Sequence, residues 1–155
     1  MAQDLHAPPR VEVTLAGFLL GPSRACGLIE DRFRRVRRRF TVELHGAWIG
    51  ELFLLDERFD YDDGRRETRQ WTVRNAGRQR FTATAPDCVG VAHGRVSGGT
   101  IHMGYAFRLQ LPRRPLVVDM DDRIHRIDAR HAINRIVVSK WGVRIAEITL
   151  CFERP

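Results

Sequence analysis

The stretch VVDMDDRIHRIDARHAINRIVVSKWGVRIAEITLCFE, residues 117–153, decides the fold. Two acids, Asp121 and Asp122, interrupt one strand-like run, and Asn134 and Arg135 interrupt the next. Strands usually keep their charged side chains on one wetted face, so polar residues spread along successive strands predict polar groups held inside a barrel. A closed sheet with a partly polar interior is typical of a protein that contains a ligand.

The same strand-like pattern continues upstream, and turn signals such as Asp62-Asp63-Gly64 separate the runs. No convincing amphipathic helix interrupts the series. The expected strands are residues 36–44, 49–59, 67–73, 80–84, 89–96, 101–111, 116–127, 131–140 and 143–152. This predicts an all-β chain forming a single antiparallel up-and-down β-barrel of about nine or ten strands, with a two-sheet sandwich as the alternative.

The domain organisation follows from the length of 155 residues, which suits one domain. We expect residues 25–155 to form the barrel domain. Residues 1–24, which contain Pro8, Pro9 and Pro22, are expected to be an N-terminal segment that closes or flanks the barrel.

The net charge of +7 comes almost entirely from arginine, because Lys140 is the only lysine. The basic run at residues 32–39 could grip phosphates, but a solvated strand face next to a basic turn is favoured. Its outward face lacks aromatic side chains for stacking bases, so no nucleic-acid partner is expected. We expect an outward-facing series of Arg35, Arg37 and Arg39. The side chains expected to face inward are Val36, Phe40, Val42, Tyr105, Phe107 and Leu109.

The three cysteines, Cys26, Cys88 and Cys151, are odd in number, widely spaced and outside any CxxC pattern. They predict free thiols and a cytoplasmic location. No signal peptide or apolar run of membrane-spanning length is visible. The histidines lack the spacing of a metal site, and no phosphate-binding loop appears, so neither metal nor cofactor is expected.

Glu57 is the most informative single acid, since it shares the parity of Leu55 and Phe59 and therefore an apolar face. Arg69 lies at a matching position on the predicted return strand, so the two can meet across the hairpin. The pair could be a structural ion pair, a reader of ligand polarity or an acid with a tuned pKa. By the same parity argument, Asp122 is expected to point inward.

Several ordered motifs resemble a bacterial family of unknown function. They are LDERFDYDDG (55–64), Arg69 with Trp71, TAPDCVGVAHGRVSGG (84–99), the two acids at 121–122, and NRIVVSKWG (134–142). The similarity spans roughly residues 17–152. Members of that family are small, commonly lipoproteins, and have a lipocalin-like or calycin-type barrel. Their genes often lie beside genes for cyclopropane-fatty-acid-synthase-like enzymes, so the resemblance implies a setting of lipid or fatty-acyl modification.

The polar residues that match the family are Glu57, Asp63, Arg69, Trp71, Asp87, Asp121, Asp122, Asn134, Arg135 and Lys140. The chain departs from the pattern at Arg123-Ile124, where the family has Trp-Met, and at Gly99-Thr100, where it has Asn-Ala. The lipoprotein signal is also missing. These departures weaken the expectation of membrane anchoring and leave room for a different ligand.

Together these observations predict a lipocalin-like barrel that binds an apolar small molecule, a fatty-acyl or similar lipid. The alternative is a small barrel enzyme, an isomerase, cyclase or hydratase, that uses Glu57 or Asp122 as general acid or base. The sequence leaves the identity of the ligand and the oligomeric state open. The predicted ligand-binding residues are Glu57, Arg69, Trp71, Tyr105, Asp122, Asn134 and Arg135.

Overall fold

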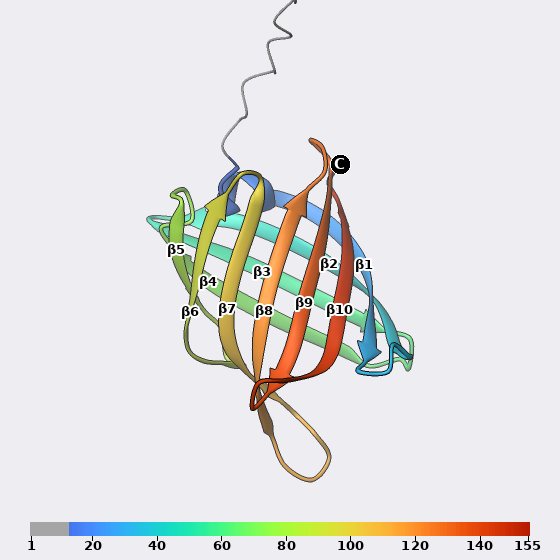
Figure 1. Cartoon of the computed structure of the whole chain (residues 1–155). Helices are drawn as coiled ribbons and strands as arrows, with labels where there is room; N and C mark the ends of the chain where they lie inside the picture. Colours follow the sequence, from blue (N-terminus) through green and yellow to red (C-terminus); the bar gives the residue numbers. More distant parts are fainter. Residues whose placement is uncertain (1–12) are drawn as a thin grey trace, which may run out of the picture.

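The computed structural model describes residues 13–155, which form a closed antiparallel barrel with one short helix (Figure 1). The helix is α1 (Leu15–Leu19), and the strands are β1 (Gly21–Asp31), β2 (Val36–Ile49), β3 (Leu52–Tyr61), β4 (Arg66–Arg74), β5 (Arg80–Thr84), β6 (Cys88–Ser97), β7 (Thr100–Leu109), β8 (Leu116–Arg126), β9 (His131–Lys140) and β10 (Val143–Glu153). Each strand pairs with its sequence neighbours, and β1 closes the ring against β10. The predicted all-β, up-and-down barrel is confirmed.

The barrel begins earlier than residue 25, which is the boundary that the sequence pattern predicts. β1 starts at Gly21, so residues 21–24 belong to the barrel wall instead of to a flanking segment. Pro22 and Arg24 are exposed while Ser23 between them is buried, a polar inward residue that hides the usual alternation. The part of the predicted flanking segment at residues 1–12 lies outside the described residues.

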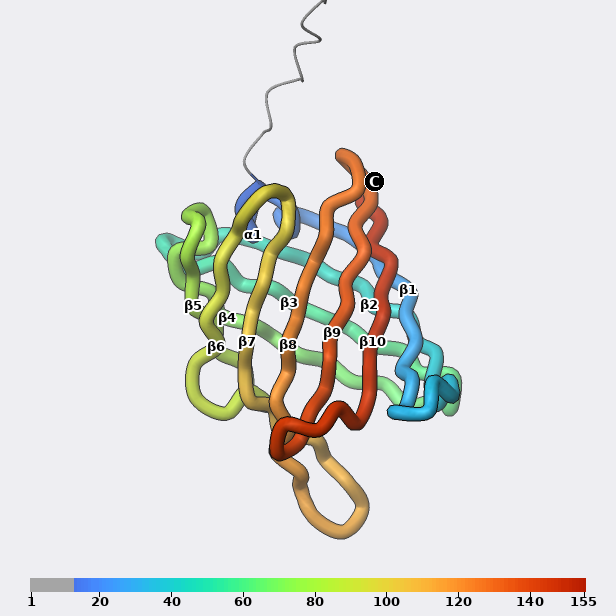
Figure 2. The backbone as a smooth tube through the Cα atoms, viewed as in Figure 1, coloured from blue at the N-terminus to red at the C-terminus, as the bar shows by residue number. Residues whose placement is uncertain are grey.

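Helix α1 lies across one end of the barrel, which we call the helix end (Figure 2). The Thr14 hydroxyl accepts a hydrogen bond from the Gly17 N–H at 2.9 Å and caps the helix. The chain then passes so close to β2 at Gly46 that a Cβ there would lie 2.1 Å from the Leu19 carbonyl oxygen. Arg154 donates to the carbonyls of Gly17 and Leu20, which ties the helix to the end of β10. The helix therefore acts as a fixed plug.

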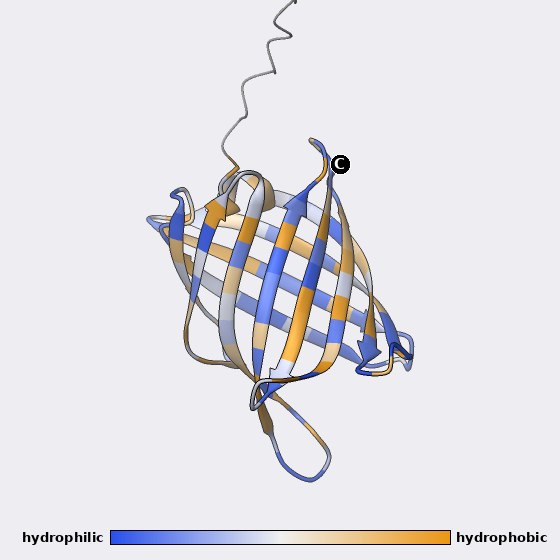
Figure 3. Ribbon diagram, in the orientation of Figure 1, coloured by the Kyte–Doolittle hydropathy of each residue, from blue (hydrophilic) through white to orange (hydrophobic). Residues whose placement is uncertain are grey.

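Hydrophobic and hydrophilic residues alternate along the strands, as Figure 3 shows. On β2, Phe40 and Val42 are buried, while Arg37 and Arg39 are exposed, as is Arg35 in the preceding turn. Burial of the apolar face supplies the main stabilisation of such a barrel. The exception to the predicted inward series is Val36, which is 38% exposed because it is the first residue of β2, beside the turn.

The inward apolar side chains differ in how deeply they are buried. Near the helix end, inward side chains such as Phe53 and Val73 are fully buried. The opposite end, which carries the turns at 32–35 and 62–65 and the connection at 110–115, is here called the loop end (Figure 2). At mid-barrel and toward the loop end, Ile29, Phe59, Tyr61, Ile136 and Ile148 are half-buried. Val118 and Val138, also toward the loop end, are buried, while Val96 and Ile124 near the helix end are half-buried. Half-buried inward apolar side chains therefore occur at both ends of the barrel.

Candidate functional site

A cluster of polar and aromatic side chains faces the interior midway along the barrel. The pleat of each strand places them there, because they share parity with buried apolar neighbours. We call this set the inner cluster; it contains Glu57 from β3, Arg69 and Trp71 from β4, Tyr105 from β7, Asp122 from β8 and Asn134 from β9.

Glu57 and Arg69 are register partners on β3 and β4, as the hairpin pattern predicts. Arg69 Nη1 lies 3.2 Å from Glu57 Oε2, and each side chain is only 14% exposed. Arg69 Nε also lies 3.5 Å from Asp87 Oδ2, at the turn before β6. The guanidinium is thus held between two carboxylates, which is the geometry of a partly buried ion-pair network.

Aromatic rings enclose the same guanidinium. Its central carbon lies 5.0 Å from the centre of the Phe59 ring and 4.8 Å from that of Phe107. Cation–π contacts of this kind are strengthened when the cation is withdrawn from water. Arg69 is therefore held by two ion pairs and by contacts with aromatic rings from β3 and β7.

The second half of the inner cluster is built around Asp122. Asn134 donates from Nδ2 to Asp122 Oδ1 at 2.6 Å, and the Tyr105 hydroxyl donates to Oδ2 at 3.2 Å. Asn134 Nδ2 also donates to the Arg123 carbonyl at 2.9 Å, which fixes the amide. Asp122 is 9% exposed and Asn134 is 4% exposed. Both donors to Asp122 are neutral, and residues 13–155 supply it with no ion-pair partner.

Burial changes the acidity of both carboxyl groups. It raises the pKa of Glu57 to about 7, even though Arg69 acts in the opposite direction, and the charge of Asp122 adds to the increase. Burial likewise raises the pKa of Asp122 to about 6, against the hydrogen bonds from Asn134 and Tyr105. The pKa of Tyr105 is raised well above its usual value by burial and by the two neighbouring acids. Both carboxyl groups therefore exchange protons near neutral pH.

Trp71 and Tyr105 connect the two halves. Their ring centres lie 5.3 Å apart with the planes at 75°, an edge-to-face contact. Trp71 is 6% exposed, and hydrogen bonding from its side chain acts to lower the pKa of Glu57, against the effect of burial. The inner cluster is therefore one connected site in which acids, an arginine and aromatic rings meet.

The structure brings together all the predicted ligand-binding residues except Arg135. That residue is exposed on the outer face of β9, where its Nη2 lies 2.8 Å from Glu147 Oε1. Arg135 follows Asn134 directly, and successive strand residues point to opposite faces, so the two cannot both face the interior. Asp121 is likewise outward, in contact with His102 at 2.9 Å, as parity predicts for both residues.

Sequence reasoning missed Asp87 and the aromatic pair around Arg69 as parts of the site. Asp87 precedes β6 in a turn, where strand parity gives no direction. It is among the residues that match the family pattern, which was the available signal. Phe59 and Phe107 come from β3 and β7, which are far apart in the chain, so only the closed ring places them on one guanidinium.

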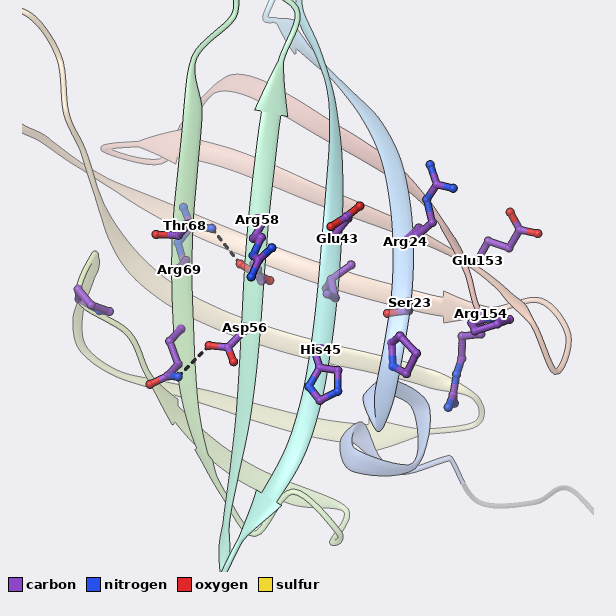
Figure 4. Close-up of a pocket in the computed structure, with 16 residues that line it drawn as sticks. Ser23, Arg24, Glu43, His45, Asp56, Arg58, Thr68, Arg69, Glu153 and Arg154 are labelled. Carbon is purple, nitrogen blue, oxygen red and sulfur yellow. Dashed lines mark hydrogen bonds and ion pairs between the residues drawn. The ribbon is translucent and has the colours of Figure 1, made fainter.

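The outer face of β1 to β4 carries a hollow of about 1110 Å³ (Figure 4). Its floor consists of outward side chains in matching register, with Glu43 opposite Arg58 and His45 opposite Asp56. Gln70 donates to Asp56 at 2.8 Å across the next strand pair. Acidic and basic side chains alternate on this exposed outer face, while the inner cluster is buried and connected, so we take the inner cluster as the stronger candidate site.

Two further findings concern the described residues. No helix among residues 13–155 is long and apolar enough to cross a membrane. The same residues contain no group of histidine, cysteine, aspartate and glutamate side chains that could hold a metal ion.

A family model described as "Protein of unknown function (DUF3833)" matches residues 3–154. The chain belongs to this family. The match covers nearly the whole barrel, in keeping with the resemblance of the ordered motifs. No curated protein matches the chain.

Solved structures share the fold of this DUF3833 protein. An S-type phycobiliprotein lyase, CPES from Guillardia theta, is similar with a TM-score of 0.65 at 8% sequence identity, over 95% of this chain and 98% of that chain. Rv2717c from M. tuberculosis is similar with a TM-score of 0.59 at 15% identity, over 88% of this chain and 92% of that chain. Both likenesses support the lipocalin-like barrel.

Proposed function

We propose that the barrel binds an apolar small molecule, a fatty-acyl or similar lipid. Its apolar part would occupy the loop end, and its polar end would meet the inner cluster. The observation that carries this proposal is the inner cluster itself, set among inward apolar side chains of which several, such as Ile29, Phe59 and Tyr61 toward the loop end, are only half-buried. A buried polar site inside an apolar container is suited to orienting a guest.

The energetics favour an apolar guest. Half-buried inward side chains such as Phe59 and Ile136 still expose apolar surface, and covering it gains about 25 cal/mol per Å². A chain-like molecule would cover several of these side chains at once. The resemblance to a family whose genes lie near lipid-modifying enzymes supports an acyl chain.

Displacement of an environment-sensitive apolar dye by acyl compounds tests the proposal. Ile136→Trp fills the interior at mid-barrel and should abolish dye binding, because Ile136 is an inward residue of β9. The matched control is Ile133→Trp on the outer face of the same strand, where the side chain is 37% exposed, and it should leave binding unchanged. Equal effects of the two variants, or an absence of dye binding by the wild-type protein, would refute binding inside the barrel.

A second candidate function, a small barrel enzyme, is favoured by one observation. Asp122 is a buried carboxyl without a cationic partner in the described residues, and burial brings its pKa to about 6, a suitable value for a general acid or base. In that case Asp122→Asn would abolish turnover of a bound compound without weakening its binding. Retained turnover in this variant would exclude this role of Asp122.

A further inference from the structure

Acidic side chains outnumber basic ones around the inner cluster, and this imbalance limits the chemistry of the polar end of a guest that can bind there. The inner cluster and its rim contain the acids Glu57, Asp87 and Asp122. Arg69 is the base that contacts this set. Acids outnumber bases where the polar end of a guest would lie, which is unfavourable for a second anion.

Arg69 is already paired with two acids. Its Nη1 lies 3.2 Å from Glu57 and its Nε 3.5 Å from Asp87, and the ring centres of Phe59 and Phe107 lie 5.0 and 4.8 Å from its central carbon. An incoming carboxylate would be a third anion beside this one cation, or would have to displace one of the two acids. Either arrangement gains little, because it adds like-charge repulsion or strands the acid that leaves.

Two inward basic groups of the described residues lie at the loop end and are also engaged. Lys140 Nζ donates to the Val117 carbonyl at 2.5 Å and lies 5.1 Å from the centre of the Trp141 ring. Arg38 pairs with Asp63 near the turn after β3. These contacts keep both cations at the rim, away from Asp122.

Asp122 is in the opposite situation, because it is an acid without a cation. Its two oxygens accept from Asn134 and Tyr105, which are neutral donors and leave the negative charge uncompensated. Burying a carboxylate without a counter-charge costs free energy. A guest that supplies a positive charge or further hydrogen-bond donors to this carboxylate would reduce that cost.

We propose that the barrel selects apolar guests whose polar end donates hydrogen bonds, either a protonated amine or a neutral hydroxyl or amide, and discriminates against a free carboxylate. This inference rests on the proposed function and narrows its ligand class: an acyl chain in neutral or amine-bearing form fits, and the free fatty-acid anion does not. Asp122 is the residue that would accept hydrogen bonds from the polar end of the guest, and Tyr105 and Asn134 hold its carboxylate in place.

A series of guests with one chain length separates these ligand classes. Decylamine, decanol and decanoate are titrated below their micelle concentrations against wild-type protein carrying the apolar dye, at about pH 8.5, where both inner carboxyl groups are ionised. We expect decylamine to bind about tenfold or more tightly than decanoate, with decanol between them or equal to the amine. The net charge of +7 favours the anion at the surface, so a preference for the amine must arise inside.

Neighbouring acids provide a matched pair of variants. Asp122→Asn keeps the shape and removes the inward charge, and it should sharply reduce the preference for the amine over decanoate. Asp121→Asn removes the adjacent outward charge and should leave the preference unchanged, since Asp121 faces His102 and Arg123 on the outer surface. Far-ultraviolet circular dichroism of both variants checks that the barrel is intact.

The outcomes distinguish the two proposals. Tight binding of amine or alcohol with weak binding of decanoate supports both. Decanoate binding as tightly as the amine, or an equal effect of the two variants, overturns the inference about the polar end and leaves the apolar container in place. Failure of every member of the series to displace the dye, or of the dye to bind, overturns the proposed function and this inference with it.

Discussion

Replacing Arg69 by leucine removes the cation from the inner cluster while keeping an apolar stem. The guanidinium contacts Glu57 and Asp87 and lies against the rings of Phe59 and Phe107, so the change leaves a buried acid unpaired. Breaking one side of a buried pair costs about 3 to 5 kcal/mol. We expect the free energy of unfolding to fall by about 3 kcal/mol at about pH 8.5, where Glu57 of the wild type is ionised and paired.

The loss of stability in Arg69→Leu should grow with pH. Without Arg69, the buried Glu57 carboxyl avoids an unpaired charge only by remaining protonated, and keeping that proton costs more free energy as the pH rises. The pKa of Glu57 is already about 7 with Arg69 present, and losing the cation raises it further. Above pH 7 the wild-type carboxyl is ionised and paired, while in Arg69→Leu it stays protonated. Each additional pH unit should then widen the difference by about 1.4 kcal/mol.

Urea unfolding followed by tryptophan fluorescence, repeated at several pH values, measures these differences. The control is Arg66→Leu on the same strand, because Arg66 pairs with Asp60 at 2.9 Å but is 85% exposed. Such a surface pair should contribute less than about 1 kcal/mol and show no growth with pH. The double variant Glu57→Leu with Arg69→Leu should recover most of the loss, since it leaves no stranded charge. A loss in Arg69→Leu as small as in the control, or a double variant no more stable than the single one, would refute the reasoning.

Three further predictions follow from the same contacts. In the folded protein the pKa is about 7 for Glu57 and about 6 for Asp122, above the ordinary 4.5 and 3.8. The two acids therefore stabilise the fold at low pH, and this contribution is lost as the pH rises through those intervals. The double variant Glu57→Gln with Asp122→Asn should remove this decline of the free energy of unfolding with pH, measured by urea unfolding at several pH values. Thiol titration of denatured protein without reductant should find three free cysteines, and a result of one would contradict the free thiols of the structure. Asn134→Leu should lower the midpoint of thermal unfolding by several degrees, because it removes a hydrogen-bond donor from the buried Asp122 carboxylate. Arg135→Leu on the outer face should change the midpoint little. Similar shifts in the two variants would argue against the inward network.

The sequence was sufficient for those parts of the site that depend on strand parity. Glu57 and Asp122 share parity with apolar neighbours, and both point inward. The meeting of Glu57 with Arg69 was also predictable, because one tight turn sets the register between their strands. These features depend on a few consecutive residues and one local hairpin.

Other parts were beyond the sequence pattern for physical reasons. The buried Ser23 and exposed Pro22 of β1 follow no apolar alternation, so the start of that strand was hidden. Treating Asn134 and Arg135 as one polar unit was wrong, since neighbours on a strand face opposite ways. The position of Phe107 against Arg69 depends on ring closure, which no local pattern encodes.

The pairing of β1 with β10 has a consequence for how the chain folds. Every other pair in the ring joins strands that are consecutive in sequence, while this one joins the two ends of the chain. Hairpins can form early from local segments, but closure between the ends has a large loop entropy and should be slow. During synthesis the outer edge of β1, with Leu28 and Ile29, has no strand to pair with until residues 143–153 have left the ribosome. An unpaired strand edge invites association with other chains, so the interval before closure is when this protein is most prone to aggregate.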